Sequence, residues 1–371
     1  MPIRVMMVGL GPIGAGVARQ VAARKTLKIV AAVDIDPEKV GKDAGEVIGL
    51  DRKLRVKVTD NATLALRNTR PQVAVLCTSS SLKGVLPQFE PVLKARVPIV
   101  STTEELAYPW YSNRALARRL DELAKNAKVA VVGTGVNPGF AMDALPIALT
   151  AACERVDSIR VDRVQDARIR RLPFQKKIGA GMTPAQFAEN VKKGTVRHVG
   201  LTESIAMIAD ALGWKVDRIT DEIGPKIAEG PVESQYVRVE EGQVCGLIQD
   251  GTGYVGGKPL IVLHMEAYLG APETYDAVAI TGSPNLHLEA EGGFHGDVAT
   301  ASITVNTIPR VLEAPPGLHT MRSLSLPSFF GGTPTRPKAE PRGRAKAARR
   351  APAKKSATGS SNSPARKLRK S

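Results

Sequence analysis

The 371-residue sequence has few of the features that mark secreted, metal-binding or membrane proteins. Its three cysteines, Cys77, Cys153 and Cys245, show no paired spacing, which argues against both a disulfide framework and a zinc site. The amino terminus does not have the pattern of a signal peptide, and no apolar run approaches the length of a membrane span. We therefore expect a soluble cytoplasmic protein with no metal site.

The net charge is strongly positive, but most of the excess lies at one end of the chain. The formal net charge is +16, and residues 332–371 hold thirteen Lys and Arg against the single Glu340. This basic tail has almost no large apolar side chains, so we expect it to be disordered. It also lacks aromatic residues on which bases could stack, so a solubilising role is favoured over weak, salt-dependent binding of polyanions.

A glycine-rich turn near the amino terminus has the spacing of a dinucleotide-binding site. The apolar run 3–10 leads into a Gly-x-Gly-x-x-Gly pattern, and a helical pattern follows over 15–24. These glycines allow a tight turn, the approach of a pyrophosphate and close packing of the helix on the strand, while the helix amino terminus presents N–H groups to phosphates. The residues predicted to contact the cofactor here are Gly9, Gly11, Pro12, Ile13 and Gly14.

A second apolar run, 27–33, ends at Asp34, twenty positions after Gly14. A carboxylate at this place accepts the two hydroxyls of an adenosine ribose, and its charge repels a 2′-phosphate, so the pattern favours NAD. NADP remains an alternative, because Lys39 and Lys42 follow closely and a loop movement would bring them to a phosphate.

Strand and helix patterns alternate through the first part of the chain. Short valine-rich runs at 73–77, 98–101 and 129–132 alternate with helical patterns at 82–95 and 111–126. This order predicts a Rossmann domain over 1–150, with a doubly wound parallel sheet that is covered on both faces.

The pattern changes after Cys153. We predict a second α+β domain over 151–297, built on a largely antiparallel sheet, followed by a helix and segment over 298–331 that return to the first domain and place the active cleft between the two. The predicted strands are 158–164, 235–239, 260–267 and 275–280, and the predicted helices are 183–193, 202–212 and 298–312.

Three polar clusters follow the ends of predicted parallel strands and should face the nicotinamide. Their hydroxyl groups and the Asn137 amide suit the cofactor carboxamide, while Gly135 lets the backbone approach the ring; ordinary capping of the following helices explains the serines equally well. The residues assigned to the cofactor are Thr78, Ser79, Ser80, Thr102, Gly135 and Asn137, and Asn137 is also assigned to the substrate.

Two adjacent acids, Glu104 and Glu105, follow the strand 98–101. One is expected to project into the cleft as a proton-transfer group, and the other to be solvated or to cap the next helix. Glu104 is preferred because it lies closer to the end of the strand. The alternative is that both are surface carboxylates.

Several long segments resemble the 2,4-diaminopentanoate dehydrogenase and amine dehydrogenase family, a branch of the dihydrodipicolinate-reductase-like enzymes. They are STTEELAYPW, GTGVNPGFAMD, RHVGLTESIAMIADALGW, GTGYVGGKPL and NTIPRVLEAPPGLHTM, and the resemblance covers about residues 1–330. It implies a homodimer and reversible, nicotinamide-dependent deamination of an amine to a ketone and ammonia. It also places the family's acid at Glu104, as the base toward the substrate ammonium and water. Residues 170–183 depart from the diaminopentanoate pattern, so a short amine and a diamino acid both stay open as substrates.

In the second domain, Arg163 and His198 are candidates to bind a substrate carboxylate, although a solvent-facing Arg and a structural His are the commoner situations. Phe140 and Phe174, with Tyr108 and Trp110, are candidate walls of the substrate pocket or plain core residues.

Two rival functions remain at this point. The first is an imine or ene reductase of the dihydrodipicolinate-reductase type. The second is a non-enzymatic, redox-sensing binding protein whose tail engages nucleic acid.

Overall fold

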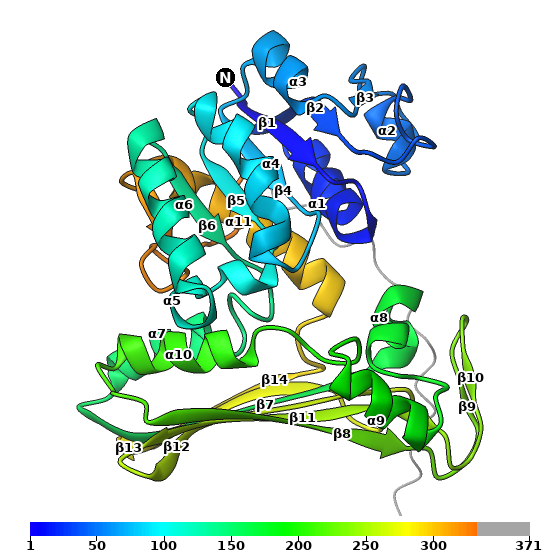
Figure 1. Cartoon of the computed structure of the whole chain (residues 1–371), viewed down its shortest axis with the longest axis vertical. Helices are drawn as coiled ribbons and strands as arrows, with labels where there is room; N and C mark the ends of the chain where they lie inside the picture. Colours follow the sequence, from blue (N-terminus) through cyan, green and yellow to red (C-terminus); the bar gives the residue numbers. More distant parts are fainter. Residues whose placement is uncertain (332–371) are drawn as a thin grey trace, which may run out of the picture. The chain divides into compact units, whose positions relative to one another are not determined.

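Seven parallel strands form the first sheet of the computed structural model, which describes residues 1–331 (Figure 1). The predicted basic tail, 332–371, lies outside the described residues. Across the sheet the strands are β15 (Gly317–His319), β6 (Ala130–Gly133), β5 (Ile99–Ser101), β4 (Val73–Leu76), β1 (Ile3–Val8), β2 (Leu27–Val33) and β3 (Val58–Thr59).

Helices cover both faces of this sheet because its central strands are apolar on both sides. Along β1, Val5 and Met7 belong to one buried cluster, whereas Met6 and Val8 belong to another on the opposite face. The helices of this part are α1 (Pro12–Ala23), α2 (Ala44–Val47), α3 (Ala62–Thr69), α4 (Leu82–Lys94), α5 (Pro109–Ser112), α6 (Arg114–Ala127) and α11 (Gly296–Glu313). The doubly wound Rossmann architecture is therefore confirmed.

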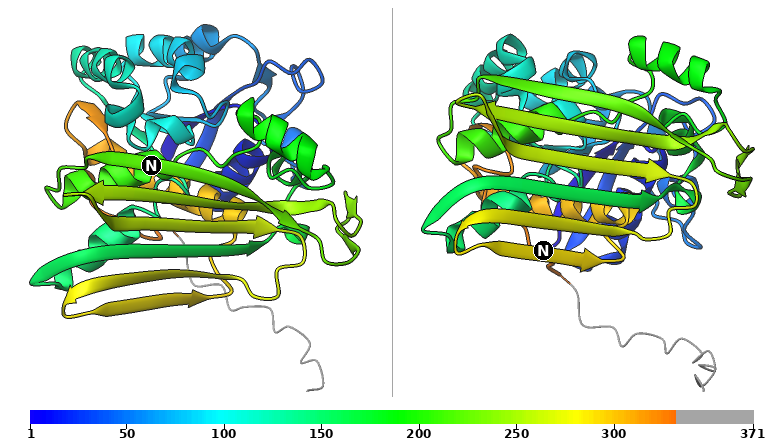
Figure 2. Two further views of the ribbon diagram at one scale, coloured as in Figure 1. Left: turned by 60° about the horizontal axis from the view of Figure 1, so that its bottom comes forward. Right: turned by 90° about the horizontal axis from the view of Figure 1, so that it is seen from below.

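The second sheet has six long strands (Figure 2). In order they are β14 (Leu286–Glu291), β13 (Tyr275–Ser283), β7 (Arg155–Asp166), β12 (Lys258–Tyr268), β11 (Val244–Val255) and β8 (Arg218–Ile227). All neighbours are antiparallel except β7 and β12, which run parallel. The sheet is thus largely antiparallel, as predicted.

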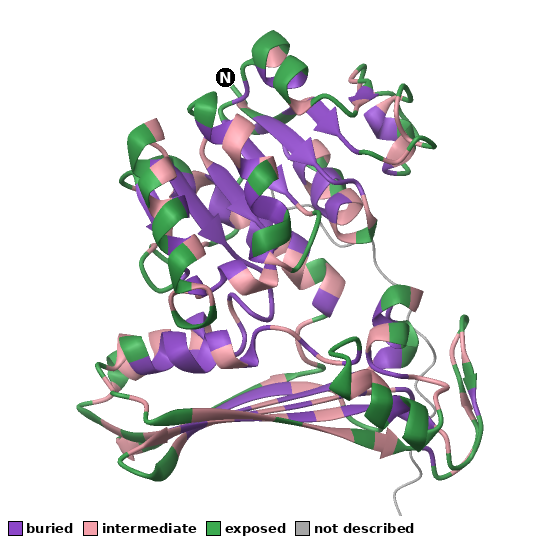
Figure 3. Cartoon of the chain, in the orientation of Figure 1, coloured by how far each residue is buried: buried purple, intermediate pink, exposed green. Residues whose placement is uncertain are grey.

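Helix α10 (Leu201–Ala211) packs closely on this sheet because β11 carries glycines beneath it. A Cβ atom on Gly251 or Gly253 would lie 2.9 or 2.6 Å from the Ile205 side chain. Most of α10 is therefore buried (Figure 3). The remaining elements of this part are α7 (Ala144–Leu149), α8 (Leu172–Lys177), α9 (Pro184–Lys192), β9 (Val232–Glu233) and β10 (Arg238–Val239).

Two details of the predicted pattern were wrong. The helix expected over 111–126 is interrupted at Asn113, which separates α5 from α6. The strand expected over 235–239 is only the two-residue β10 in a small hairpin with β9. Helix α11 begins at Gly296 and packs against α1. Among residues 1–331, no helix has the length and apolar character needed to cross a membrane.

Candidate active site

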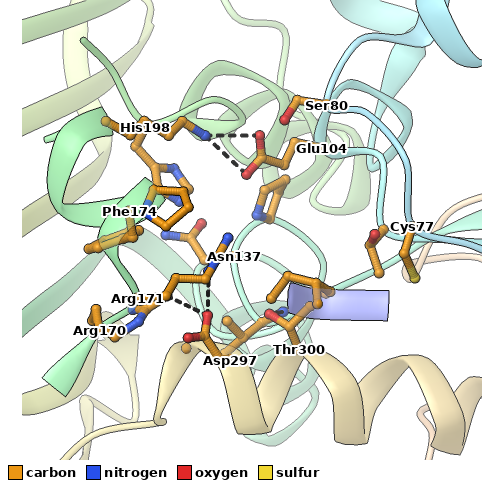
Figure 4. A pocket seen from close by; sticks show the side chains of 18 of the residues that line it. Cys77, Ser80, Glu104, Asn137, Arg170, Arg171, Phe174, His198, Asp297 and Thr300 are labelled. Atoms are coloured by element: carbon orange, nitrogen blue, oxygen red, sulfur yellow. Dashed lines mark hydrogen bonds and ion pairs between the residues drawn. The ribbon is translucent and has the colours of Figure 1, made fainter. Parts of the chain in front are cut away.

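A cavity of about 350 Å³ lies where the carboxyl ends of the parallel strands meet the second sheet (Figure 4). Its walls come from the loops after β4, β5 and β6, from β7 and α8, and from the start of α11. In an open α/β sheet this edge is the usual place for a ligand. The polar lining residues are Thr78, Ser79, Ser80, Thr102, Glu104, Thr134, Asn137, Arg163, Gln165, Arg170, Arg171, Lys177, His198, Asp297 and Thr300.

The glycine turn after β1 fits a dinucleotide pyrophosphate. A Cβ on Gly14 would lie 1.9 Å from the Gly9 carbonyl oxygen, so this position requires glycine for packing. A Cβ on Gly11 would meet nothing within 4 Å, which leaves open space at the amino terminus of α1. Gly11 caps α1 without a side-chain bond and Pro12 follows, so the first-turn N–H groups stay available to phosphate oxygens. Ile13, the second residue of α1, lines the cavity.

Asp34 lies at the end of β2, beside the glycine turn. Its Oδ2 accepts hydrogen bonds from the Leu10 N–H at 2.7 Å and from Lys39 Nζ at 3.2 Å, and its Oδ1 accepts from the Asp36 N–H at 3.0 Å. Burial raises the pKa of this carboxyl, but the hydrogen bonds and Lys39 outweigh burial and leave the pKa below its usual value. An ionised carboxylate therefore stands next to the turn, as an adenosine ribose requires.

The predicted polar loops meet at the cavity. Thr78, Ser79, Ser80, Thr102 and Gly135 all line it. Asn137 lines it as well, and its buried Oδ1 has no hydrogen-bond partner among the described residues, which leaves one acceptor for a ligand.

The two adjacent acids, Glu104 and Glu105, have different surroundings. Glu104 starts a short 3-10 helix (Glu104–Leu106) after β5, and its carboxylate lines the cavity with 22% of the side chain exposed. The Glu105 carboxylate does not line the cavity and instead accepts a hydrogen bond from the Leu82 N–H, at 2.7 Å, at the start of α4. Glu104 is therefore the neighbour placed to meet a ligand, and Glu105 caps a helix.

The segment from Arg170 to Lys177 forms one wall of the cavity, and Phe174 is its one residue that was predicted to line the pocket. Lys177 Nζ lies 3.2 Å from Glu104 Oε2, and Arg171 Nη1 lies 2.5 Å from Asp297 Oδ1 (Figure 4). Arg170 also reaches Asp297 Oδ1, at 3.1 Å, and stacks over the Phe174 ring at 4.0 Å from its centroid. The cations of this wall were missed, and the sequence signal that would have found them is the dense run of Arg and Lys in RIRRLPFQKK, residues 168–177.

Arg163 lines the cavity, and two of its side-chain nitrogens already have partners within the protein. Arg163 is buried and forms an ion pair with Asp276, and its Nη2 donates a hydrogen bond to the Phe294 carbonyl oxygen at 2.9 Å. Arg163 is therefore anchored in the wall by Asp276 and Phe294, while the remaining N–H donors of its guanidinium have no hydrogen bond to the described residues.

His198 and the phenylalanines divide between the cavity and the core. The His198 backbone is held by Gln249 through two hydrogen bonds of 2.8 and 3.0 Å, and the buried Nδ1 has no partner among the described residues. Burial and the charge of Lys177 hold the pKa of His198 well below its ordinary value, so the ring is neutral. Phe174 lines the cavity, whereas Phe140 does not and packs edge-on against Phe294, 5.8 Å between ring centroids.

Tyr108 and Trp110 line a different hollow of about 520 Å³, together with Trp214 and Asp210. The expectation that they wall the same pocket as Phe174 was therefore wrong. Within residues 1–331, no group of three or more His, Cys, Asp or Glu side chains is arranged to hold a metal ion.

Comparisons with known proteins agree with this architecture. A family model described as the 2,4-diaminopentanoate dehydrogenase C-terminal domain matches residues 140–336, and one described as the dihydrodipicolinate reductase N-terminus matches residues 3–132. The chain is 33% identical over 337 residues to the 2,4-diaminopentanoate dehydrogenase of Acetoanaerobium sticklandii, covering 89% of this chain and 95% of that protein.

Two further relatives carry the name amine dehydrogenase. The protein from Streptomyces virginiae is 25% identical over 356 residues, covering 89% of this chain and 98% of its own. The solved structure from Mycobacterium smegmatis is 27% identical with a TM-score of 0.80, covering 90% of this chain and 99% of that chain.

Proposed function

The chain belongs to the 2,4-diaminopentanoate dehydrogenase family, and we propose that it is an NAD-dependent amine dehydrogenase with Glu104 as its proton-transfer residue. The reaction converts a short amine or diamino acid, with water, into a ketone and ammonium. The observation that carries the proposal is the place of Glu104, in the cavity at the strand ends beside the dinucleotide turn.

Bound at the glycine turn, NAD would supply one function, the acceptance of a hydride by its nicotinamide. Residues of the chain carry out the proton transfers and orient the substrate. Glu104 holds the substrate ammonium by a charge-assisted hydrogen bond and takes its proton, so that the nitrogen lone pair assists the departure of hydride from the adjacent carbon. Glu104 releases this proton to solvent, and the regenerated carboxylate accepts a proton from the water that adds to the imine carbon. That proton is delivered to the amino nitrogen, which leaves as ammonia and takes up the hydroxyl proton as the ketone forms. The unpartnered Asn137 Oδ1 accepts an N–H from the substrate or the carboxamide and orients it.

The cofactor preference follows from Asp34. Its carboxylate is ionised and held by three hydrogen bonds, and a 2′-phosphate placed beside it would be repelled. Lys39 already pairs with this carboxylate at 3.2 Å, so its charge is directed to Asp34. These contacts support NAD over NADP.

The proposed assembly is a homodimer through the outer face of the second sheet. No helix of residues 1–331 covers the face opposite α10 (Figure 2), where Ile248, Tyr254 and Val262 stay partly exposed. The same face carries the ion pairs Arg160–Asp162 and His264–Asp250, so a second copy would bury a mixed apolar and charged surface of an open six-stranded sheet. Light scattering should give twice the mass of the chain, and Val262→Glu should give a monomer; a monomeric wild-type protein would contradict the dimer.

The proposed function is tested with a panel of short amines and diamino acids, with NAD and NADP, at alkaline pH. We expect at least one of these substrates to yield reduced cofactor, ketone and ammonia in equal amounts, with NAD preferred. Reduction of an imine or alkene without release or uptake of ammonia would support the reductase alternative instead.

A further inference from the structure

A strongly cationic hollow lies at the edge of the first sheet opposite the candidate active site. It has a volume of about 480 Å³ and is formed by the end of α1, the start of β2 and the loop before β3. No Asp or Glu lines it, and five of its ten lining residues are cations: Arg24, Lys25, Lys28, Arg52 and Lys53. We call it the basic hollow. The active-site cavity lies at the carboxyl ends of the strands, so a ligand in the basic hollow would leave that cavity open.

Within residues 1–331, the two arginines of the basic hollow bond to neutral groups. Arg52 Nη2 donates a hydrogen bond to the Ala22 carbonyl oxygen at 2.8 Å, and Arg24 Nη1 donates one to Asn306 Oδ1 at 2.7 Å. The three lysines are exposed to solvent. A concave surface lined by charges of one sign focuses its electric field and concentrates ions of the opposite sign. The basic hollow is therefore suited to an anionic ligand.

An exposed aromatic ring lies beside the basic hollow. The Arg24 guanidinium stacks on the rings of Phe329 and Phe330, with each ring centroid 4.9 Å away, and donates a hydrogen bond to the Phe330 carbonyl oxygen at 3.2 Å. These contacts fix the segment next to the cationic wall. Phe329 is 70% exposed, so its ring is available for a base to stack on it.

The described part of the chain ends at the same place. A Cβ atom on Gly331 would lie 2.2 Å from Thr26 Oγ1, so Gly331 lies against the turn between α1 and β2 that also carries Lys25. From there the sequence continues into residues 332–371, with thirteen cations and one acid. So many cations suit a long polyanion better than a single phosphate group. This tail has no aromatic residue of its own, and Phe329 supplies one beside the basic hollow.

We propose that the basic hollow, Phe329 and the basic tail together bind single-stranded nucleic acid. The lysines and arginines neutralise backbone phosphates, and a base stacks on the Phe329 ring. An anionic membrane fits this surface less well, because the cations line a concave hollow and not a flat face. The proposal goes beyond the proposed function and does not depend on it.

Fluorescence anisotropy of a labelled oligothymidine of about 20 nucleotides tests the proposal on the full-length protein. We expect saturable binding that weakens as the salt concentration rises. Replacing Lys25, Lys28 and Lys53 together with Gln should weaken this binding about tenfold or more, and should reduce the slope of log K against log salt concentration by about 2. The matched control replaces three exposed lysines of the second part of the chain with Gln, and its affinity should stay within about twofold of the wild type. These control lysines are Lys192, Lys215 and Lys258.

The stacking step is tested with Phe329→Ala. This variant should bind the single strand about fivefold or more weakly, and should bind a duplex of the same length as the wild type does, because paired bases are not available to the ring. Thermal unfolding of each variant checks that the fold is retained.

Three results would overturn the proposal. Unchanged affinity in the triple variant of the basic hollow would assign the binding to the tail alone. An equal loss in the triple control would show that only net charge matters. Binding to vesicles of phosphatidylglycerol and phosphatidylcholine, without binding to the oligothymidine at the same salt concentration, would identify a membrane as the partner.

Discussion

The Lys177 ammonium lies 3.2 Å from Oε2 and 3.4 Å from Oε1 of Glu104, so the carboxylate proposed as the base already has a cationic partner from the other side of the cavity. These distances exceed the 2.7–2.9 Å of a strong charge-assisted hydrogen bond. A loose pair of partly exposed groups contributes about 1 kcal/mol or less. A substrate ammonium can therefore displace Lys177 at small cost, and Lys177 competes with it for Glu104.

Replacing Lys177 with Met should remove this competition. We expect KM for an amine without a carboxylate, such as 4-aminopentanamide, to fall about two- to fivefold, which corresponds to about 1 kcal/mol or less. Steady-state kinetics with NAD at saturation measures the change. Lys176→Met is the matched control, because Lys176 is the exposed neighbour and lines no part of the cavity. A rise in KM in the Lys177 variant would show that Lys177 assists binding instead.

Two glycines of the turn after β1 should respond differently to alanine. In Gly11→Ala the new methyl group meets no protein atom within 4 Å, so the fold should be retained, but the methyl group would occupy space needed by a pyrophosphate. We expect an unchanged melting temperature and about tenfold weaker NAD binding by calorimetry. In Gly14→Ala the methyl group would lie 1.9 Å from the Gly9 carbonyl oxygen, and the free energy of unfolding should fall by about 1–3 kcal/mol or more. Normal NAD affinity in Gly11→Ala would place the cofactor elsewhere.

Cofactor preference should depend on the Asp34 charge. In Asp34→Asn the amide oxygen accepts one of the two backbone N–H groups that the carboxylate holds, the repulsion of a phosphate is removed, and Lys39 loses one of its two carboxylate partners. The NADP-to-NAD ratio of kcat/KM should rise about tenfold or more. Initial rates with both cofactors measure this ratio, and an unchanged ratio would remove Asp34 from cofactor discrimination.

The buried His198 should make the protein less stable in mild acid. Its folded-state pKa lies well below the unfolded value of about 6.5, so between these values the unfolded chain binds a proton that the folded chain does not. Its contribution to stability is complete above pH 6.5 and is lost as the pH falls toward the folded-state pKa, by up to about 1.4 kcal/mol per pH unit. Denaturant unfolding at several pH values should show that the free energy of unfolding falls less on acidification in His198→Gln than in the wild type. Equal slopes for the two proteins would contradict this account.

The first half of the fold could be predicted because its signals are local. The run from Ile3 through Gly14 to Asp34 has a strand, a turn and an acid at fixed spacings, and the structure places β1, α1 and β2 there. The interruption at Asn113 was missed because the helical period continues across it in the sequence. The strand β8 was also missed, since its residues are mostly half-buried and show no clear alternation.

The cavity could be predicted only in part. The polar loops and Glu104 lie at strand ends, so topology alone brings them together. Lys177, Arg171 and Asp297 reach the cavity from α8 and α11, which lie far apart in the sequence, and their meeting depends on how the second sheet packs against the first. Likewise, the ion pair of Arg163 with Asp276 depends on a pairing of β7 with β13 that no local pattern encodes.

The most direct test of the central claim is the rate of NAD reduction by an amine substrate in Glu104→Gln and Glu105→Gln, with thermal unfolding measured on both. Glutamine keeps the shape of each side chain but removes the proton acceptor at Glu104, whereas at Glu105 it still accepts the Leu82 N–H. We predict that Glu104→Gln loses about 10²- to 10⁴-fold in kcat while folding normally, and that Glu105→Gln stays within about threefold of the wild type. Near wild-type turnover in a folded Glu104→Gln variant would contradict the account.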